Sequence, residues 1–160
     1  MRKIAKPLFL LSIILVLLSC SENPQPVTPE FYKIITGKTK KTWKVTTIQW
    51  TGEGKSDITY SLNSCLKDDL YVFYANEERL YEVTNGASKC SSDEADTIIS
   101  DVWSFVNATS TLTIIMPLLS DSNLPFFVRK VTSKEMTLEI YIDQDSKYSY
   151  KITMQSVSEV

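Results

Sequence analysis

Two stretches near the C-terminus, Met136-Thr137-Leu138-Glu139-Ile140-Tyr141-Ile142 and Tyr148-Ser149-Tyr150-Lys151-Ile152-Thr153-Met154, alternate between apolar and mostly polar residues. Successive side chains of a β-strand point to opposite faces of a sheet, so a period of two predicts a strand with one buried face. Neither stretch has the three- and four-residue spacing of an amphipathic helix. We therefore predict two β-strands here and an all-β fold.

Weaker alternations of the same kind run through most of the preceding chain. They predict further strands over residues 43–50, 57–62, 69–74, 79–84, 98–106, 111–116 and 125–131. A short helical turn over residues 30–37, ending at a glycine, is the exception. Eight or nine short strands in sequence predict an antiparallel meander, and closing it into a barrel removes the exposed strand edges. A flattened sandwich is the competing architecture.

Length and composition limit the function. The chain has 160 residues, about one domain, and contains no histidine. This excludes the Ser-His-Asp and Cys-His catalytic groups and nearly every common zinc or copper site. Seventeen basic against 19 acidic residues leave no cationic surplus for binding nucleic acid. We expect no cofactor, no metal and no nucleic-acid partner, and a protein that is not an enzyme.

The N-terminus carries a targeting signal. Arg2, Lys3 and Lys6 precede an apolar run over residues 8–18, which is shorter than the roughly 20 residues that a membrane-spanning helix needs. The run ends in Leu17-Leu18-Ser19-Cys20, which resembles the lipobox of bacterial lipoproteins. The resemblance implies that residues 1–19 are a signal peptide and that Cys20 becomes the lipidated first residue.

The mature chain is expected to be tethered to a membrane rather than to span it. Residues 20–33 form a proline-rich tether and the start of the helical turn, and residues 34–158 form the barrel domain. Without residues 1–19 the net charge falls from −2 to −5, so the domain is repelled from anionic lipid. The residue after Cys20 is Ser21 and not an aspartate, and in this the chain resembles lipoproteins that are sent on to the outer membrane. We expect the anchor there, on its periplasmic face or at the cell surface.

Two cysteines remain after Cys20 is lipidated. Cys65 and Cys90 flank a predicted hairpin, and an exported chain with an even number of cysteines favours a disulfide. Two separate buried thiols are the alternative.

Several motifs together resemble the bacterial lipocalin-like domains over residues 34–155. These are Ile35-Thr36-Gly37-Lys38 followed by Trp43-Lys44-Val45, the run Cys65-Leu66-Lys67-Asp68-Asp69-Leu70-Tyr71-Val72-Phe73, Cys90, and Val102-Trp103-Ser104-Phe105 followed by Leu112-Thr113-Ile114. The resemblance implies a lipocalin-like β-barrel. It implies no enzymatic activity.

Three polar motifs are weaker candidates for chemistry. Asp68-Asp69 is a possible acid–base pair, but neighbouring strand residues face opposite ways, so a strand-entry turn is favoured. The acidic run with Asp93, Glu94 and Asp96 lacks the glycine and the spacing of a calcium loop, which favours a solvated loop. Asn107-Ala108-Thr109 matches a glycosylation sequon but is expected to be a turn.

The aromatic residues on the predicted strands give the clearest functional hypothesis. An eight-stranded barrel is either filled by side chains or holds one small ligand. The candidates for lining such a pocket are Trp43, Tyr71, Phe73, Trp103 and Phe105. We expect a lipoprotein that binds a small apolar or amphipathic ligand. The alternatives are an interaction or structural accessory protein with a filled barrel and, less favoured, a hydrolase that uses carboxylates alone.

The lipoprotein hypothesis predicts that the chain is not lipidated when the sulfur of Cys20 is removed. Cys20→Ala lacks the sulfur that would accept the lipid, so it should stay unprocessed, whereas the wild-type chain should be shortened and labelled during growth with radioactive palmitate. Gel mobility and autoradiography measure both properties. Equal labelling of the two proteins would contradict the hypothesis.

Overall fold

The structure, a computed structural model, describes residues 30–52, 54–142 and 147–160. The predicted signal peptide, Cys20 and most of the tether lie outside the described residues. Helices α2 (Glu30–Thr36) and α3 (Ser64–Lys67) and the 3-10 turns η1 (Thr59–Ser61) and η2 (Asn107–Thr109) are short. The strands are β1 (Lys40–Gly52), β2 (Gly54–Asp57), β3 (Leu70–Tyr74), β4 (Leu80–Thr84), β5 (Thr97–Val102), β6 (Ser104–Val106), β7 (Thr111–Met116), β8 (Ser120–Val131), β9 (Glu135–Tyr141) and β10 (Ser149–Glu159).

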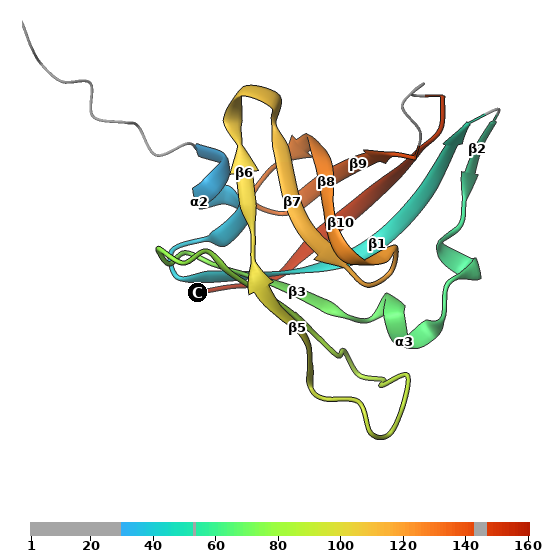
Figure 1. Cartoon of the computed structure of the whole chain (residues 1–160), viewed down its shortest axis with the longest axis horizontal. Helices are drawn as coiled ribbons and strands as arrows, with labels where there is room; N and C mark the ends of the chain where they lie inside the picture. Colours follow the sequence, from blue (N-terminus) through green and yellow to red (C-terminus); the bar gives the residue numbers. More distant parts are fainter. Residues whose placement is uncertain (1–29, 53, 143–146) are drawn as a thin grey trace, which may run out of the picture.

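The strands form a nearly closed antiparallel barrel (Figure 1). Nine of them pair in the order β5-β4-β3-β1-β10-β9-β8-β7-β6, and β2 extends one end of β1 as a hairpin. Only Trp103 separates β5 from β6 in the chain, so the two ends of the sheet meet in one segment. The predicted all-β meander barrel with a short N-terminal helix is confirmed.

The pairing of β1 with β10 joins the beginning of the barrel to its end. The two strands are in register from Lys41 opposite Glu159 to Thr51 opposite Ser149. Register shifts at Thr42/Trp43 and Val45/Thr47 allow the strands to bend. Lys41 is 1% exposed, and its Nζ lies 2.8 Å from an Oε of Glu159 and 4.9 Å from the ring centre of Trp43. The buried lysine is therefore paired in charge and packed on an aromatic face.

Side chains fill the interior of the barrel. Trp43 and Trp103, both candidates for lining the barrel, face inward. Trp43 is 0% exposed and Trp103 is 1% exposed. The core also contains Ile35, Val45, Ile48, Tyr71, Phe73, Tyr81, Val83, Leu112, Ile114, Met116, Phe126, Met136, Leu138, Ile152 and Met154. The strand pairs and this core lie within residues 35–159, so the barrel carries its own hydrophobic core. None of the helices in the described part of the chain is long and apolar enough to cross a bilayer.

The strand predicted over residues 57–62 is wrong. β2 ends at Asp57, and the chain turns through η1 instead. The backbone N–H of Thr59 donates to the Asp57 carboxylate over 2.8 Å, and the Thr59 hydroxyl accepts the backbone N–H of Ile48 over 2.8 Å. Side chains thus replace the hydrogen bonds that another strand would have made.

Two other predicted strands differ in their limits. The strand expected over residues 98–106 is interrupted at Trp103, where pairing passes from β4 to β7. β8 starts five residues before Pro125, which lies inside the strand. β9 pairs with β8 only from Phe127 onward, so Pro125 has no partner on the β9 side. A proline has no backbone N–H, and here its absence removes no hydrogen bond between β8 and β9.

Helix α2 covers one end of the barrel. It ends where predicted, at Gly37, whose φ of 67° is the left-handed conformation that glycine adopts without strain. The indole N–H of Trp43 donates to the Ile35 carbonyl over 2.9 Å. α2 also contacts β1, β3 and β8, which lie on different sides of the barrel, so it reaches across the opening (Figure 1).

The disulfide lies away from α2. Cys65 in α3 and Cys90 in the loop after β4 lie at disulfide-bonding distance with a Cα–Cα separation of 5.1 Å. The Asp68 carboxylate accepts the backbone N–H of Ser88 over 2.9 Å. A Cβ on Gly86 would lie 2.1 Å from the Asp68 carbonyl oxygen, so glycine permits this close approach of the two chain segments.

Removing the cross-link should destabilise the barrel. Because the bond closes a loop with a sequence separation of 25 residues, Cys65→Ser/Cys90→Ser should lower the free energy of unfolding by about 3–4 kcal/mol. Urea unfolding of the chain from Ser21 onward measures the change, and non-reducing peptide mapping should find a Cys65–Cys90 fragment in the wild type. Two thiols that alkylate freely in the oxidised protein would contradict the assignment.

Candidate functional site

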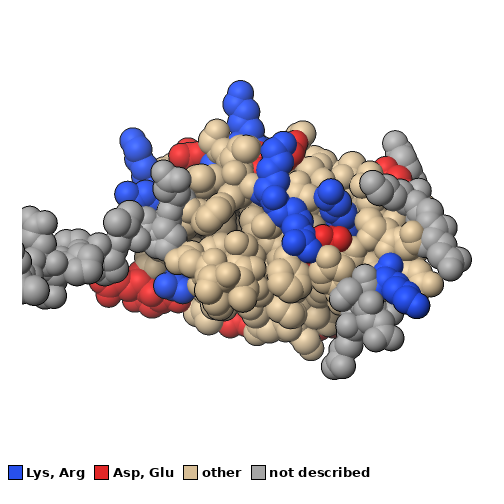
Figure 2. Space-filling view, turned by 90° about the horizontal axis from the view of Figure 1, so that it is seen from above, with Lys and Arg blue, Asp and Glu red and all other residues tan. Residues whose placement is uncertain are grey.

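Charge by itself does not mark a binding site on the face shown in Figure 2. Lys and Arg side chains occur there together with Asp and Glu side chains, around a broad area that carries neither. Small-molecule sites are better recognised as hollows that combine apolar walls with a few polar groups.

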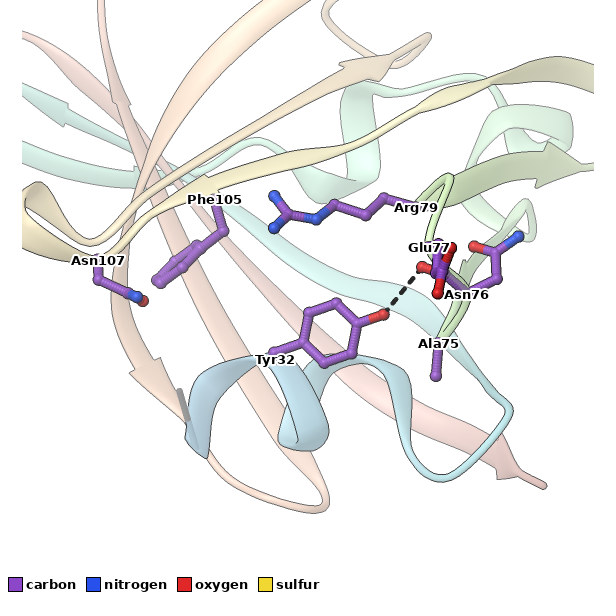
Figure 3. A pocket seen from close by; sticks show the side chains of 7 residues that line it. All are labelled: Tyr32, Ala75, Asn76, Glu77, Arg79, Phe105 and Asn107. Atoms are coloured by element: carbon purple, nitrogen blue, oxygen red, sulfur yellow. Dashed lines mark hydrogen bonds between the residues drawn. The ribbon is translucent and has the colours of Figure 1, made fainter. Parts of the chain in front are cut away.

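One such hollow lies between α2 and the barrel (Figure 3). Its volume is about 450 Å³, and its lining residues are Tyr32, Ala75, Asn76, Glu77, Arg79, Phe105 and Asn107. We call it the α2 cleft. Its residues come from α2, from the turn between β3 and β4, from β6 and from η2, which are distant in the sequence.

Hydrogen bonds hold the β3–β4 turn against α2. The Tyr32 hydroxyl donates to the Asn76 carbonyl over 3.1 Å. The same carbonyl accepts the backbone N–H of Arg79 over 3.2 Å, and the Asn76 side-chain oxygen accepts the backbone N–H of Leu80 over 2.9 Å. Helix and turn are therefore fixed to each other, and the two walls of the cleft keep their spacing.

Trp103 lies beneath the cleft and links it to the core. Its ring stacks on Tyr32 with centroids 5.2 Å apart, and Phe73 meets it edge-on at 5.7 Å. The guanidinium carbon of Arg79 lies 5.8 Å from the Trp103 ring centre, and the Trp103 backbone N–H donates to the Arg79 carbonyl over 2.9 Å. The indole N–H has no hydrogen-bond partner. Trp103 is therefore in contact with two residues that line the cleft.

A second hollow, of about 500 Å³, lies on the other side of Tyr32. It shares Tyr32 and Ala75 with the α2 cleft, and its other lining residues are Lys33, Gly37, Lys38 and Glu159. Its lining contains one aromatic ring, whereas the α2 cleft has two. The α2 cleft is therefore the better candidate for an apolar or amphipathic ligand.

The five residues expected to line a pocket occupy two different environments. Trp43, Tyr71 and Phe73 are 0% exposed and Trp103 is 1% exposed, all within the packed interior. Phe105 is half-buried and lines the α2 cleft. A ligand in the cleft would touch Phe105 and lie above Trp103, while the other three are separated from it by packed side chains.

Most of the cleft was not found from the sequence. The sequence predicts Tyr32 only as part of the short helical turn, and Asn76 and Glu77 only as part of a turn between two strands. The amphipathic character of residues 30–36 is the one signal that α2 would dock on something, and it does not indicate where. The sequence gives no signal for Arg79, because only the folded chain brings it into one cleft with Phe105 and Tyr32.

Asp69 is a buried carboxylate at the start of β3. It is 1% exposed, and neither of its oxygens accepts a hydrogen bond of normal geometry. Burial, together with the negative charges of Asp68 and Glu94, raises the pKa of Asp69 to about 6, and the nearby Gly86 N–H offsets a smaller part. Burial and the Asp69 charge also raise the pKa of the Tyr71 hydroxyl above its usual range.

Two residues of the acidic run after Cys90 make local contacts. The Glu94 carboxylate accepts the Cys90 backbone N–H over 2.8 Å, and Asp96 pairs with Lys89 at 2.7 Å. Within residues 30–52, 54–142 and 147–160, no group of three His, Cys, Asp or Glu side chains is placed to hold a metal ion. Asn107 starts the exposed turn η2, as expected for that sequon.

Comparison with known proteins adds no assignment. No family model matches the chain, and a search of curated proteins finds no match. The function is therefore argued from the cleft and the sequence motifs.

The raised pKa of Asp69 predicts how stability changes with pH. A folded-state pKa of about 6, against about 3.9 in the unfolded chain, means that the folded state binds more protons between these values. The free energy of unfolding should therefore fall by about 2–3 kcal/mol as pH rises from 4 to 7. Asp69→Asn should remove this loss, so it should be more stable relative to the wild type at pH 7 than at pH 4.

Urea unfolding at both pH values measures the effect. Asp93→Asn is the matched control, because Asp93 is exposed and its change should leave the pH profile as it is. Parallel profiles for the wild type and Asp69→Asn would contradict the assignment.

Proposed function

We propose that this chain is an exported, lipid-anchored protein that binds a small apolar or amphipathic molecule in the α2 cleft. In this proposal Cys20 holds the protein at the outer membrane, and residues 21–29 separate the barrel from the lipid surface. The protein acts by binding and not by catalysis. The lipobox and the resemblance to lipocalin-like domains support the anchored, ligand-binding assignment.

The α2 cleft is the observation that carries the proposal. Its volume of about 450 Å³ falls within the range of about 300–1,000 Å³ for ligand sites. Tyr32 and Phe105 give it aromatic walls, and the polar side chains of Asn76, Arg79 and Asn107 lie around them (Figure 3). An amphipathic molecule could place its apolar part against the aromatic rings and its polar part against these side chains.

The packed barrel interior favours this location over the centre of the barrel. Tyr71, Tyr81 and Phe73 are 0% exposed and occupy the space that a central ligand would need. Close-packed interiors resist insertion because a guest must displace side chains from their contacts. A ligand at the α2 end requires no such displacement.

The filled interior also favours a second candidate function. A barrel whose core is packed can serve as a structural or interaction accessory protein, with its surface as the working part. The two functions differ in one measurable property, which is saturable binding of a small molecule at the cleft.

Tryptophan emission should report the ligand. In titrations of the chain from Ser21 onward with a panel of fatty acids and aromatic metabolites, we expect a saturable change in emission, because Trp103 stacks on Tyr32 and contacts Arg79. Trp103→Phe should lose this change. Trp50→Phe should keep it, because Trp50 packs on Tyr148 and Tyr150, outside the cleft lining.

A flat response to the whole panel, with binding also absent by equilibrium dialysis, would reject the ligand-binding function. The accessory function would then stand. A saturable response that persists in Trp103→Phe and disappears in Trp50→Phe would instead place the ligand away from the α2 cleft.

A further inference from the structure

Arg79 is a cation without a carboxylate partner among the described residues. It forms none of the ion pairs among these residues, and its guanidinium lies over the face of Trp103. Arg129 offers a direct comparison, because it also lies over aromatic rings, at 5.2 Å from Phe127. Arg129, however, is bound to the Glu139 carboxylate at 2.6 Å. Of these two arginines, Arg79 is the one that has no carboxylate partner within residues 30–52, 54–142 and 147–160.

The backbone at Arg79 is in a conformation that disfavours any residue with a Cβ atom. Its φ is 56°, in the left-handed region that glycine and asparagine prefer. A glycine in this position of the turn would relieve the strain. Strained residues are concentrated at functional sites, but Ser110 at the end of η2 has the same conformation, so a role for Arg79 is argued from where its side chain lies.

The direction of the side chain shows where that role lies. Arg79 extends from the β3–β4 turn across the cleft toward Phe105 (Figure 3). The ring of Tyr32 lies on the α2 side of the Arg79 side chain. Glu77 stays at the turn beside Asn76. The centre of the cleft therefore combines one guanidinium with two aromatic rings, and the only carboxylate among its lining residues lies at the edge.

We infer that the ligand of the α2 cleft is a small amphipathic carboxylate, with its anionic group on Arg79 and its apolar body between Tyr32 and Phe105. This inference rests on the proposed function. The planar guanidinium matches a carboxylate with two parallel hydrogen bonds, which are stronger than bonds between neutral groups. Glu77 at the edge repels a second negative charge, so the cleft favours a monoanion over a dianion.

The test compares two probes that differ only in the charged group, 4-phenylbutyrate and 4-phenylbutan-1-ol. Isothermal titration calorimetry of the chain from Ser21 onward measures both, and it avoids the change in Trp103 emission that an Arg79 substitution would itself cause. The wild type should bind the acid about two- to fivefold more tightly than the alcohol, because Arg79 is exposed and ion pairs at exposed sites are weak. Arg79→Gln should lose this preference, with the affinity for the alcohol changed less than about twofold.

Two further variants make the result specific. Arg129→Gln removes an equivalent arginine from the outside of the barrel, so it should keep the preference for the acid. Glu77→Gln removes the neighbouring negative charge and should tighten binding of the acid by about two- to threefold more than it changes binding of the alcohol. Circular dichroism confirms that each variant is folded.

The outcomes separate the inference from the function on which it rests. Saturable binding of acid and alcohol with equal affinity would overturn the carboxylate inference and leave the α2 cleft as a binding site. An acid preference that survives Arg79→Gln or is lost in Arg129→Gln would also overturn it. Binding of neither probe, together with a flat response to the wider panel, would reject the proposed function and this inference with it.

Discussion

The rest of the structure depends on the pairing of β1 with β10. This contact joins the first strand of the barrel to the last, and its two register shifts let both strands curve around the core. Lys41 and Glu159 lock its end with an ion pair, in which the lysine is buried against Trp43. Because the start of β1 and the end of β10 are held together, α2 is brought to the same end of the barrel, where it covers the opening.

Trp103 connects this closure to the candidate site. It stands between β5, which pairs with β4, and β6, which pairs with β7, so its backbone joins the two ends of the sheet while its ring enters the core. The next inward residue, Phe105, is placed at the edge of α2 and meets Phe31 at 5.7 Å. Tyr32 then stacks on Trp103 from the helix side. The α2 cleft is therefore a consequence of how the barrel closes.

The two ends of the barrel are stabilised in different ways. At the α2 end, aromatic stacking and the hydrogen bond from Trp43 to Ile35 hold the helix in place. At the disulfide end, the Cys65–Cys90 bond and the contact between Asp68 and Ser88 hold two loops together. That second arrangement buries Asp69 close to other acidic groups, which raises the pKa of its carboxyl. The α2 end thus contains the proposed ligand site, and the other end contains the cysteine pair and the buried carboxyl of Asp69.

The sequence by itself determined the strands, the helical turn at Gly37, the inward tryptophans and the cysteine pair, because these follow from local periodicity and from residue chemistry. Where side-chain hydrogen bonds competed with the sheet, as at Thr59, the local pattern predicted the wrong element. Only the tertiary structure decided that the interior is filled and that the cleft lies outside it. That outcome depends on how strands from distant parts of the chain pair and how closely their side chains pack. The role proposed for Arg79 has the same origin, since Arg79, Tyr32 and Phe105 line one cleft only after the barrel has closed.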